Sequence, residues 1–334
     1  MPGKNLQVLL ASRPAGWVKE SDFRIVETPV PTAGEGKVLV RNLFLSLDPY
    51  MRGRMNDARS YAAKVELGDV MGGETIGEVV ESGNPKFKPG DVVSTRSGWQ
   101  QYGLSDGGDL RKLDPTLKPL SAYLGVVGMP GVTAWVGLLE IGQPKPGETV
   151  VVSAASGAVG GVVGQLAKTR DCRVVGIAGG REKCDYVVKE LGFDACIDHR
   201  AGNLPQALAD ATPKGIDVYF ENVGGPILDM VLMRCNPFAR IPLCGMISQY
   251  NATDDRYGVK NLMMAVGMRI KLQGFIVSDH MPRWPDALQQ LAQGVRAGKI
   301  KFRETVTEGL ENAPRAFIGL LKGENFGKQV VKLA

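Results

Sequence analysis

The sequence is poor in the residues that bind catalytic metals. It contains two histidines, His199 and His280, and five cysteines, none of which form a CxxC pair. An odd number of cysteines without paired spacing is typical of reduced thiols in a cytoplasmic protein rather than of a disulfide framework. We therefore expect a cytoplasmic protein with no histidine-rich metal site.

The sequence also lacks long apolar runs and any large excess of one charge. Segment 1–14, MPGKNLQVLLASRP, has too short an apolar core for a signal peptide, and no run reaches membrane-spanning length. The net charge of +5 comes from cations scattered among acids. These absences argue against membrane and nucleic-acid partners and leave a small molecule as the expected partner.

Glycine, by contrast, is abundant, with 43 residues, and one glycine-rich stretch organises the chain. Val150–Val152 is a β-branched run suited to a strand that is buried on both faces. Small residues follow, and apolar residues then recur at helical spacing at Val159, Val162, Val163 and Leu166. In such a strand–turn–helix, glycines let a phosphate approach the main chain, here at Gly157, Gly160 and Gly164. Ala155 replaces the first glycine of the strict GxGxxG motif, so the stretch alone also fits a tightly packed turn.

The two parts of the chain differ in pattern. Residues 1–125 contain short strands between turn signals, which predict a partly open barrel, at Leu6–Leu10, Phe23–Glu27, Val38–Leu47, Thr75–Glu81, Asp91–Ser94 and Gln101–Leu104. A helix is expected at Gly128–Gly142. Strands then alternate with helices; the strands are Arg173–Ala178, Ala195–Asp198, Asp217–Glu221, Arg240–Cys244 and Lys271–Val277, and the helices are Glu182–Leu191, Leu204–Ala211, Pro226–Met233 and Asn261–Met268. This alternation predicts a doubly wound parallel sheet of the Rossmann type.

The C-terminal part adds a helix at Pro285–Ala297, a strand at Phe302–Val306, a helix near Ala313–Lys322 and a strand at Gln329–Leu333. We expect that last strand to return to the N-terminal domain. The predicted domains are therefore 1–125 with 301–334, and 126–300. Within the first, Asp-Pro in LSLDPYMRGRM should place Tyr50 and Arg52 on a loop, which is either functional or a turn with a packed tyrosine.

The end of the second predicted strand indicates which nucleotide binds. NAD-binding folds place an acid there for the ribose hydroxyls, but GIAGGREK (Gly176–Lys183) has none at the tip. Arg181 and Lys183 could instead pair with a 2′-phosphate, although they could also merely open a solvated helix. The missing acid and the two cations together favour NADPH.

These motifs resemble the zinc-independent branch of the medium-chain dehydrogenase/reductase superfamily, which contains prostaglandin reductases and plant and bacterial alkenal double-bond reductases. The resemblance covers nearly the whole chain and rests on LSLDPYMR, GMPGVTAW, AASGAVGGVVGQLAK, AGGREK, ENVGG, CGMISQYN, GFIVSD and GENFGKQV. It implies a GroES-like barrel domain joined to a Rossmann domain, with the active site in the cleft between them. It also implies a homodimer; the late, apolar strand Lys271–Val277 would pair at the sheet edge, which light scattering can check.

The resemblance implies the following cofactor contacts in this chain. The pyrophosphate would face Gly157, Ala158, Val159 and Gly160. Lys183 would hold the 2′-phosphate with Gly180 and Arg181, and His199 stands where relatives often have tyrosine, so it is either a phosphate partner or a surface residue. The cofactor would be lined by Asn222, Cys244, Gly245, Ile247 and Ser248, its nicotinamide anchored by Phe275, Ile276 and Val277, and Asn325 would close over it.

The resemblance and the residues together predict reduction of an α,β-unsaturated aldehyde or ketone. Hydride added at the β carbon leaves negative charge on the carbonyl oxygen, and a phenol can donate a hydrogen bond to it. Tyr250, on a loop after a Rossmann strand, is the expected donor, or else contacts only the cofactor ribose. Tyr50 would bound the substrate pocket. A quinone reductase, or an NADPH-binding sensor without turnover, remains an alternative.

The first testable prediction is metal independence. Zinc-using relatives carry GHE near GGETIG (Gly72–Gly77), and Gly73 replaces that histidine. Elemental analysis of protein purified without added metal should find no stoichiometric zinc, and a chelator should leave activity intact. Activity that is lost in chelator and restored by zinc would contradict this prediction.

Overall fold

The computed structural model describes residues 3–333, which fold as two units. Unit 1 runs to Leu124 and resumes at Glu304, and unit 2 comprises Gly125–Arg303. No helix among the described residues is both long and apolar enough to cross a membrane.

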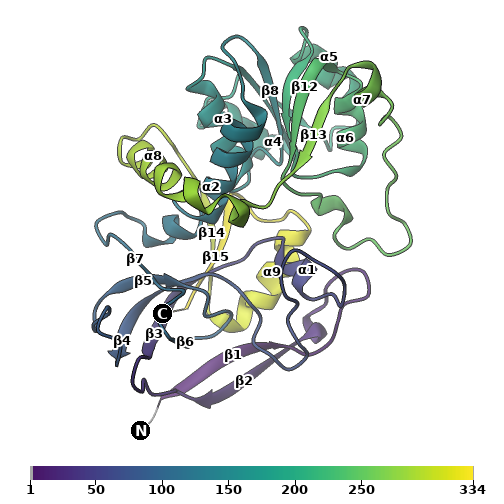
Figure 1. Ribbon diagram of the computed structural model, residues 1–334. Coiled ribbons are helices and arrows are strands. Elements are labelled where there is room, and N and C mark those ends of the chain that lie inside the picture. Colours follow the sequence, from purple (N-terminus) through teal and green to yellow (C-terminus); the bar gives the residue numbers. More distant parts are fainter. Residues whose placement is uncertain (1–2, 334) are drawn as a thin grey trace. The chain divides into compact units, whose positions relative to one another are not determined.

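Unit 2 is built on a six-stranded parallel sheet, as predicted (Figure 1). Its strands are β8 (Thr149–Ser153), β9 (Arg173–Ala178), β10 (Ala195–Asp198), β11 (Ile216–Phe220), β12 (Cys235–Leu243) and β13 (Lys271–Gly274). Their spatial order is β10-β9-β8-β11-β12-β13. The order reverses between β8 and β11, and ligands of doubly wound sheets bind outside the carboxyl ends of the strands at this switch point.

Helices lie on both sides of this sheet (Figure 1). They are α2 (Met129–Trp135), α3 (Gly160–Lys168), α4 (Arg181–Lys189), α5 (Leu204–Ala211), α6 (Gly225–Leu232), α7 (Met264–Gly267) and α8 (Trp284–Arg296). The strands β8 and β11 are almost wholly buried, because their β-branched and aromatic side chains pack against helices from both faces.

Unit 1 is β-rich. A seven-stranded sheet contains β3 (Val38–Ser46), β4 (Thr75–Ser82), β5 (Val92–Thr95), β6 (Tyr102–Ser105), β7 (Arg111–Lys112), β14 (Glu304–Glu308) and β15 (Lys328–Lys332), and β1 (Lys4–Leu10) pairs with β2 (Phe23–Pro29). The closing strand β15 lies antiparallel to β3, so the chain's last strand completes the N-terminal sheet. Helices α1 (Met51–Arg54) and α9 (Ala313–Leu321) belong to the same unit.

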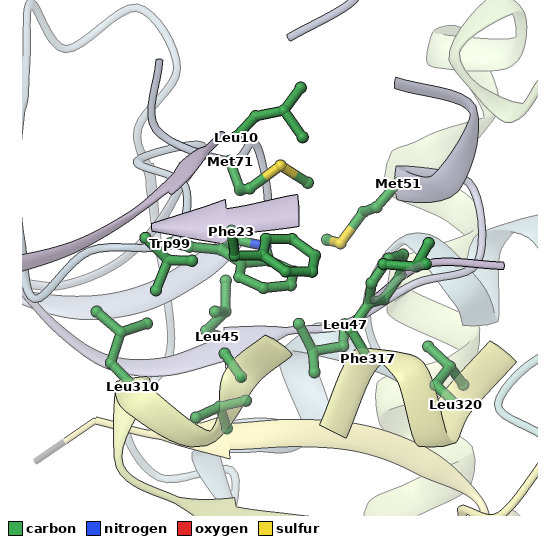
Figure 2. Packing of buried hydrophobic residues seen from close by; sticks show 14 of the residues in the cluster. Leu10, Phe23, Leu45, Leu47, Met51, Met71, Trp99, Leu310, Phe317 and Leu320 are labelled. Atoms are coloured by element: carbon green, nitrogen blue, oxygen red, sulfur yellow. The ribbon is translucent and has the colours of Figure 1, made fainter. Parts of the chain in front are cut away.

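An aromatic cluster fills the core of unit 1 (Figure 2). Trp99 is fully buried, stacks on Phe23 with ring centroids 5.5 Å apart, and meets Phe317 of α9 edge-on at 5.7 Å. Apolar side chains from both ends of the sequence therefore share one core, which fastens the C-terminal segment to the N-terminal strands.

One expectation about local structure is wrong, and two expected helices are present with a different type or length. Arg52 lies in α1 and not on a loop, because the carbonyls of Asp48 and Pro49 accept the first hydrogen bonds of a short helix. The expected helix at Gly128–Gly142 is α only to Trp135 and continues as a π-helix over Val136–Gly142, where Gly137 lies against the rings of Phe220 and Phe275. The expected helix at Asn261–Met268 shortens to α7.

Strand β13 is at the sheet edge, as predicted, but ends at Gly274. Nearby in sequence, Leu262, Met263 and Val266 expose 52%, 82% and 79% of their surface, an unusual degree for apolar side chains. The homodimer stays a prediction. If the edge strand β13 pairs with its copy in a dimer, we expect these exposed apolar side chains to belong to the same interface.

The packing of Gly164 on α3 yields a stability prediction. A Cβ at this position would lie 1.8 Å from Cζ of Phe193, a buried ring. Gly164→Ala should therefore destabilise unit 2 by about 1–3 kcal/mol despite the better helix propensity of alanine. Thermal unfolding should show a lower Tm, by roughly 2–4 °C per kcal/mol.

Gly53→Ala is the matched control, because a Cβ at Gly53 in α1 would have no neighbour within 4 Å. It should leave Tm unchanged or raise it slightly. Equal Tm values for both variants would show that the ring of Phe193 moves aside freely.

Candidate functional site

Ser153, the last residue of β8, connects the two strands at the switch point. Its Oγ donates to Oε1 of Glu221 at 2.8 Å and accepts the N–H of Asn222 at 2.8 Å. The Asn222 side-chain amide donates to the carbonyl of Ser153, also at 2.8 Å. The chain leaving β8 and the chain leaving β11 are therefore held together where a ligand is expected.

Hydrogen bonds from the residues after β11 fix the loop that carries Tyr250. The carbonyl of Glu221 accepts the N–H of Cys244 at 2.9 Å, and that of Asn222 accepts the N–H of Ile247 at 3.2 Å. Ser248 donates its N–H and its hydroxyl to the carbonyl of Val223. This places the predicted lining residues, Asn222, Cys244, Gly245, Ile247 and Ser248, in one connected group.

Tyr250 ends the short 3-10 turn Ile247–Gln249, and its side chain turns back toward the start of its loop. The N–H of Met246 donates to the Tyr250 hydroxyl at 3.3 Å. A Cβ on Gly245 would lie 2.8 Å from that hydroxyl, so glycine is needed to let the phenol approach the backbone. The hydroxyl is thus positioned by its own loop, beside the residues that follow β11.

Glu221 is a buried acid beneath this loop. It is fully buried, and Oε1 accepts the N–H of Val223 at 2.6 Å. Burial raises the pKa of Glu221, and it raises the pKa of the neighbouring Tyr219 well above its usual range. Neither Glu221, which belongs to the ENVGG motif, nor Ser153 has a role predicted from the sequence. A serine at the end of one buried strand and an acid at the end of the next were the available signal.

The glycine-rich turn occupies the carboxyl end of β8. Ala154 has φ +50°, and the turn continues through Gly157, Ala158 and Val159 into α3. A Cβ on Gly160 would lie 2.4 Å from the Ala154 carbonyl, whereas one on Gly157 would meet nothing closer than 3.1 Å. Gly160 is thus required by packing, whereas a side chain at Gly157 would be crowded less. At the start of α3 the N–H of Gly161 donates to the carbonyl of Gly157, and the N–H groups of Val162 and Val163 donate to that of Val159, so a phosphate here would face the glycine-rich turn itself.

A second group of predicted residues gathers at the start of α4. Gly180 is its N-cap, with φ 100°, and donates its N–H to Oδ1 of Asp198 at 2.8 Å. The same carboxylate oxygen accepts the N–H of Arg200 at 2.9 Å. These backbone bonds lower the pKa of Asp198 and leave this acid engaged by the main chain.

Cations converge on that turn. Partial burial and the nearby Arg200 guanidinium lower the pKa of Lys183, and desolvation with Arg200 lowers the pKa of His199. A Cβ on Gly179 would lie 2.9 Å from Nε of Arg200 and 3.0 Å from Nε2 of His199. A phosphate dianion would relieve the repulsion among these groups, so the site fits one. Arg200 was not predicted as part of this group. Its position directly after His199 was the only feature of the sequence that indicated it.

The predicted nicotinamide segment lies immediately after β13. Phe275 packs edge-on against Phe220 at 6.3 Å, and the indole N–H of Trp284 donates to the carbonyl of Val277 at 3.1 Å. Ile276, between Phe275 and Val277 in the chain, has an extended backbone conformation. The backbone of this segment is therefore held by its own unit.

Tyr50 and Asn325 belong to unit 1. Burial and the carboxylates of Asp48 and Glu74 raise the pKa of Tyr50 above its usual range, which keeps its hydroxyl protonated. Burial also raises the pKa of Glu74 to about 7. Asn325 donates its amide to the carbonyl of Gly327 at 2.8 Å.

A buried ion pair accompanies Tyr50. Nζ of Lys328 lies 2.8 Å from Oδ1 of Asp48 and donates to the carbonyl of Leu47 at 2.6 Å. The charge of this lysine is thereby satisfied within unit 1.

The described residues 3–333 contain no group of three or more His, Cys, Asp or Glu side chains that could hold a metal ion. At Gly73, a Cβ would lie 3.0–3.2 Å from Leu45, Met51 and Trp99. A side chain at this position would therefore have to displace the core of unit 1.

Comparison with known proteins gives matches along most of the chain. Residues 6–113 match a family described as the N-terminal domain of oxidoreductase, and residues 158–293 match one described as zinc-binding dehydrogenase. The chain is 52% identical to the NADPH-dependent curcumin reductase of Escherichia coli (strain K12), over 99% of this chain and 97% of that protein. It is 44% identical to the 2-alkenal reductase (NADP(+)-dependent) of Nicotiana tabacum, over 99% and 98%. The crystal structure of CurA from Vibrio vulnificus in complex with NADPH superposes with a TM-score of 0.94, at 49% identity over 98% of this chain and 99% of that one.

Lys183, His199 and Arg200, the cation group, lead to a prediction about NADPH affinity. Lys183→Ala should raise the Michaelis constant for NADPH about ten- to a hundredfold and leave that for NADH nearly unchanged, because a charge-assisted bond is worth about 1.5–3 kcal/mol. Arg200→Ala should act in the same direction. Steady-state kinetics with both nucleotides measure the effect.

Lys189→Ala, an exposed change on the last turn of α4, is the control and should alter neither constant. Equal use of the two nucleotides by the unmutated protein would refute the assignment of this site.

Proposed function

Because the chain belongs to the medium-chain dehydrogenase/reductase family, we propose that it reduces the carbon–carbon double bond of α,β-unsaturated aldehydes and ketones with NADPH. The protein is an NADPH-dependent oxidoreductase of the curcumin, prostaglandin and alkenal reductase type. The substrate class and the residue roles given below are the proposal.

The residues of unit 2 provide the elements of a dinucleotide site. The turn from Gly157 to Gly160 would receive the pyrophosphate, and Lys183 and Arg200 would pair with the 2′-phosphate, with His199 beside them. The chain from Phe275 to Val277 would contact the nicotinamide. The bound nucleotide supplies the hydride, and the chain's own residues orient the substrate and stabilise charge.

Tyr250 would stabilise the charge that develops on the substrate. When the β carbon of an enal or enone gains hydride, electrons shift onto the carbonyl oxygen, and a hydroxyl donor there lowers the barrier. The hydrogen bond that the Tyr250 hydroxyl accepts from Met246 strengthens the hydroxyl as a donor through cooperativity. A proton from water would then complete the α carbon.

The observation that carries this proposal is the anchoring of the Tyr250 loop at the switch point. The carbonyls of Glu221, Asn222 and Val223 fix the loop, so the phenol is held on rigid elements beside the expected position of the nucleotide. Tyr50, kept protonated by its raised pKa, is the proposed substrate contact from unit 1.

A panel of enals, enones and quinones, assayed by NADPH oxidation with identification of the products, tests the function. Saturated aldehydes and ketones are the expected products. Turnover of quinones alone would replace the proposal with a quinone reductase, and tight NADPH binding without consumption of any compound would indicate a binding protein. Allylic alcohols would show that hydride attacks the carbonyl carbon and that the assigned reaction is wrong.

Tyr250→Phe gives the sharpest mechanistic prediction. The variant keeps the ring and removes the donor, so turnover of a conjugated enone should fall roughly a hundred- to a thousandfold, equivalent to about 2.7–4 kcal/mol. NADPH affinity, measured by fluorescence titration, should change little. Tyr257→Phe removes the hydroxyl that donates to Asp229 and serves as the control, for which turnover should be retained. Near-full turnover by Tyr250→Phe would place the oxyanion's donor elsewhere.

A further inference from the structure

The π-helix Val136–Gly142, which follows α2, is fixed to the sheet of unit 2. Its last turn closes with a hydrogen bond from the N–H of Gln143 to the carbonyl of Leu138, five residues back, at 2.7 Å. The Arg240 guanidinium on β12 donates to the carbonyls of Gly142 and Gln143, each at 2.9 Å. Turns of this kind are rare and are frequent at functional sites, so the contacts of this one bear on the reaction.

Gly137 lies where the π-helix meets the rings of Phe220 and Phe275. A Cβ at this position would be 2.5 Å from Cε2 of Phe220 and 2.6 Å from Cζ of Phe275. Carbon atoms in ordinary contact are about 3.5–4.0 Å apart, so neither ring leaves room for a side chain. Gly137 therefore lets both rings lie closer to the π-helix than any other residue would allow.

The two rings differ in their freedom to move. Phe220 is the last residue of β11 and is fully buried. Phe275 is partly exposed and follows the edge strand β13, outside the sheet. A side chain at position 137 would therefore displace Phe275 rather than Phe220, by about 1 Å if an ordinary contact is to be restored.

Further contacts join the chain after Phe275 to the same helical region. Oε2 of Glu140 in the π-helix lies 3.3 Å from a guanidinium nitrogen of Arg283. The indole N–H of Trp135, the last residue of α2, donates to Oε1 of Gln290 on α8 at 3.0 Å. The segment from Phe275 to α8 is thus supported by α2 and the π-helix.

We propose that Gly137 is a positioning residue for hydride transfer, because it sets where the nicotinamide segment, Phe275–Val277, stands in unit 2. This rests on the proposed function, which assigns the nicotinamide contact to that segment. Gly137 itself touches neither nucleotide nor substrate. It acts through the ring of Phe275, which its missing side chain admits about 1 Å deeper than alanine would.

A small displacement of the nicotinamide segment affects the reaction more than it affects binding. Hydride passes between atoms held about 3–3.5 Å apart in the right orientation, and a misplacement of about 1 Å can cost roughly a hundredfold in rate. The proposed phosphate contacts of NADPH lie elsewhere, at the turn Gly157–Gly160 and at Lys183 and Arg200. They keep the nucleotide bound when the segment moves, so a change at Gly137 separates turnover from affinity.

The test is Gly137→Ala in the full-length protein. Turnover of an enone should fall about a hundredfold, whereas NADPH affinity, measured by fluorescence titration, should stay within about threefold. With NADPH deuterated at the transferred position, the kinetic isotope effect on kcat should be at least as large as that of the unmutated protein, because hydride transfer becomes the slow step. A merely structural role would lower Tm without these changes. Full turnover by Gly137→Ala would overturn the proposal.

Phe275→Leu identifies the ring through which Gly137 acts. Leucine lacks the ring carbon that a Cβ at position 137 would meet, so adding Gly137→Ala to Phe275→Leu should change turnover by less than about threefold relative to Phe275→Leu alone. A loss that persists in that background would place the clash at Phe220 and overturn the proposal. If Gly137→Ala alone does not fold, the double variant should fold as Phe275→Leu does, and its failure to fold would count as the same contradiction.

Gly142→Ala, in the same π-helix, is the matched control. A Cβ there would lie 3.1 Å from Cγ1 of Val218, and its three nearest atoms belong to neither ring. This variant should lower Tm slightly and keep turnover within about twofold of the unmutated protein. An equal loss of turnover in Gly137→Ala and Gly142→Ala would show a general effect on the π-helix and would rule out positioning through Phe275.

Failure of the proposed function is a separate outcome of these measurements. If the unmutated protein reduces no enal or enone, the emission of bound NADPH decides the placement of the nicotinamide. Gly137→Ala should then lower the fluorescence of the bound nicotinamide, because the ring loses its contact with the displaced segment, and Gly142→Ala should not. Equal emission from both variants would overturn the role of Gly137.

Discussion

The switch point of the parallel sheet in unit 2 depends on the hydrogen bonds that join Ser153, Glu221 and Asn222. The Ser153 hydroxyl serves the ends of both strands at the switch point, as donor to the Glu221 carboxyl and as acceptor from the Asn222 N–H. The carbonyls of Glu221 and Asn222 in turn fix the loop that ends in Tyr250. Because Glu221 is fully buried, losing one of these partners would leave a further polar group without water, so each hydrogen bond of the network supports the others.

The glycines of the turn after β8 share a motif and differ in their physical roles. Gly160 and Gly164 are imposed by neighbours, the Ala154 carbonyl and the Phe193 ring. Gly157 has more open space, which suits a phosphate against the main chain. The motif thus combines two packing requirements, which bring α3 close to the sheet, with one position that a ligand could use.

The cation group at the start of α4 stores electrostatic repulsion in the protein without its nucleotide. Lys183, His199 and Arg200 come from two separate connections, after β9 and β10. Burial and the Arg200 guanidinium lower the pKa values of Lys183 and His199. The Asp198 carboxylate accepts the backbone N–H groups of Gly180 and Arg200, and its charge offsets part of the repulsion felt by His199. An anion bound there would gain from all three side chains, and the proposed preference for a phosphate would depend on residues that two strands supply together.

The sequence by itself determined the doubly wound sheet, because strand and helix periodicities are local properties; the predicted bounds of Arg173–Ala178, Ala195–Asp198 and Leu204–Ala211 match β9, β10 and α5. It also determined the family, through motifs spread over the chain. It could not show that Arg200 joins Lys183 or that Ser153 and Glu221 support the Tyr250 loop, and it misplaced Arg52, which is in α1. Each of these facts depends on residues brought together by the order β10-β9-β8-β11 or by packing within unit 1, and such contacts between distant residues leave no periodic signal in the chain.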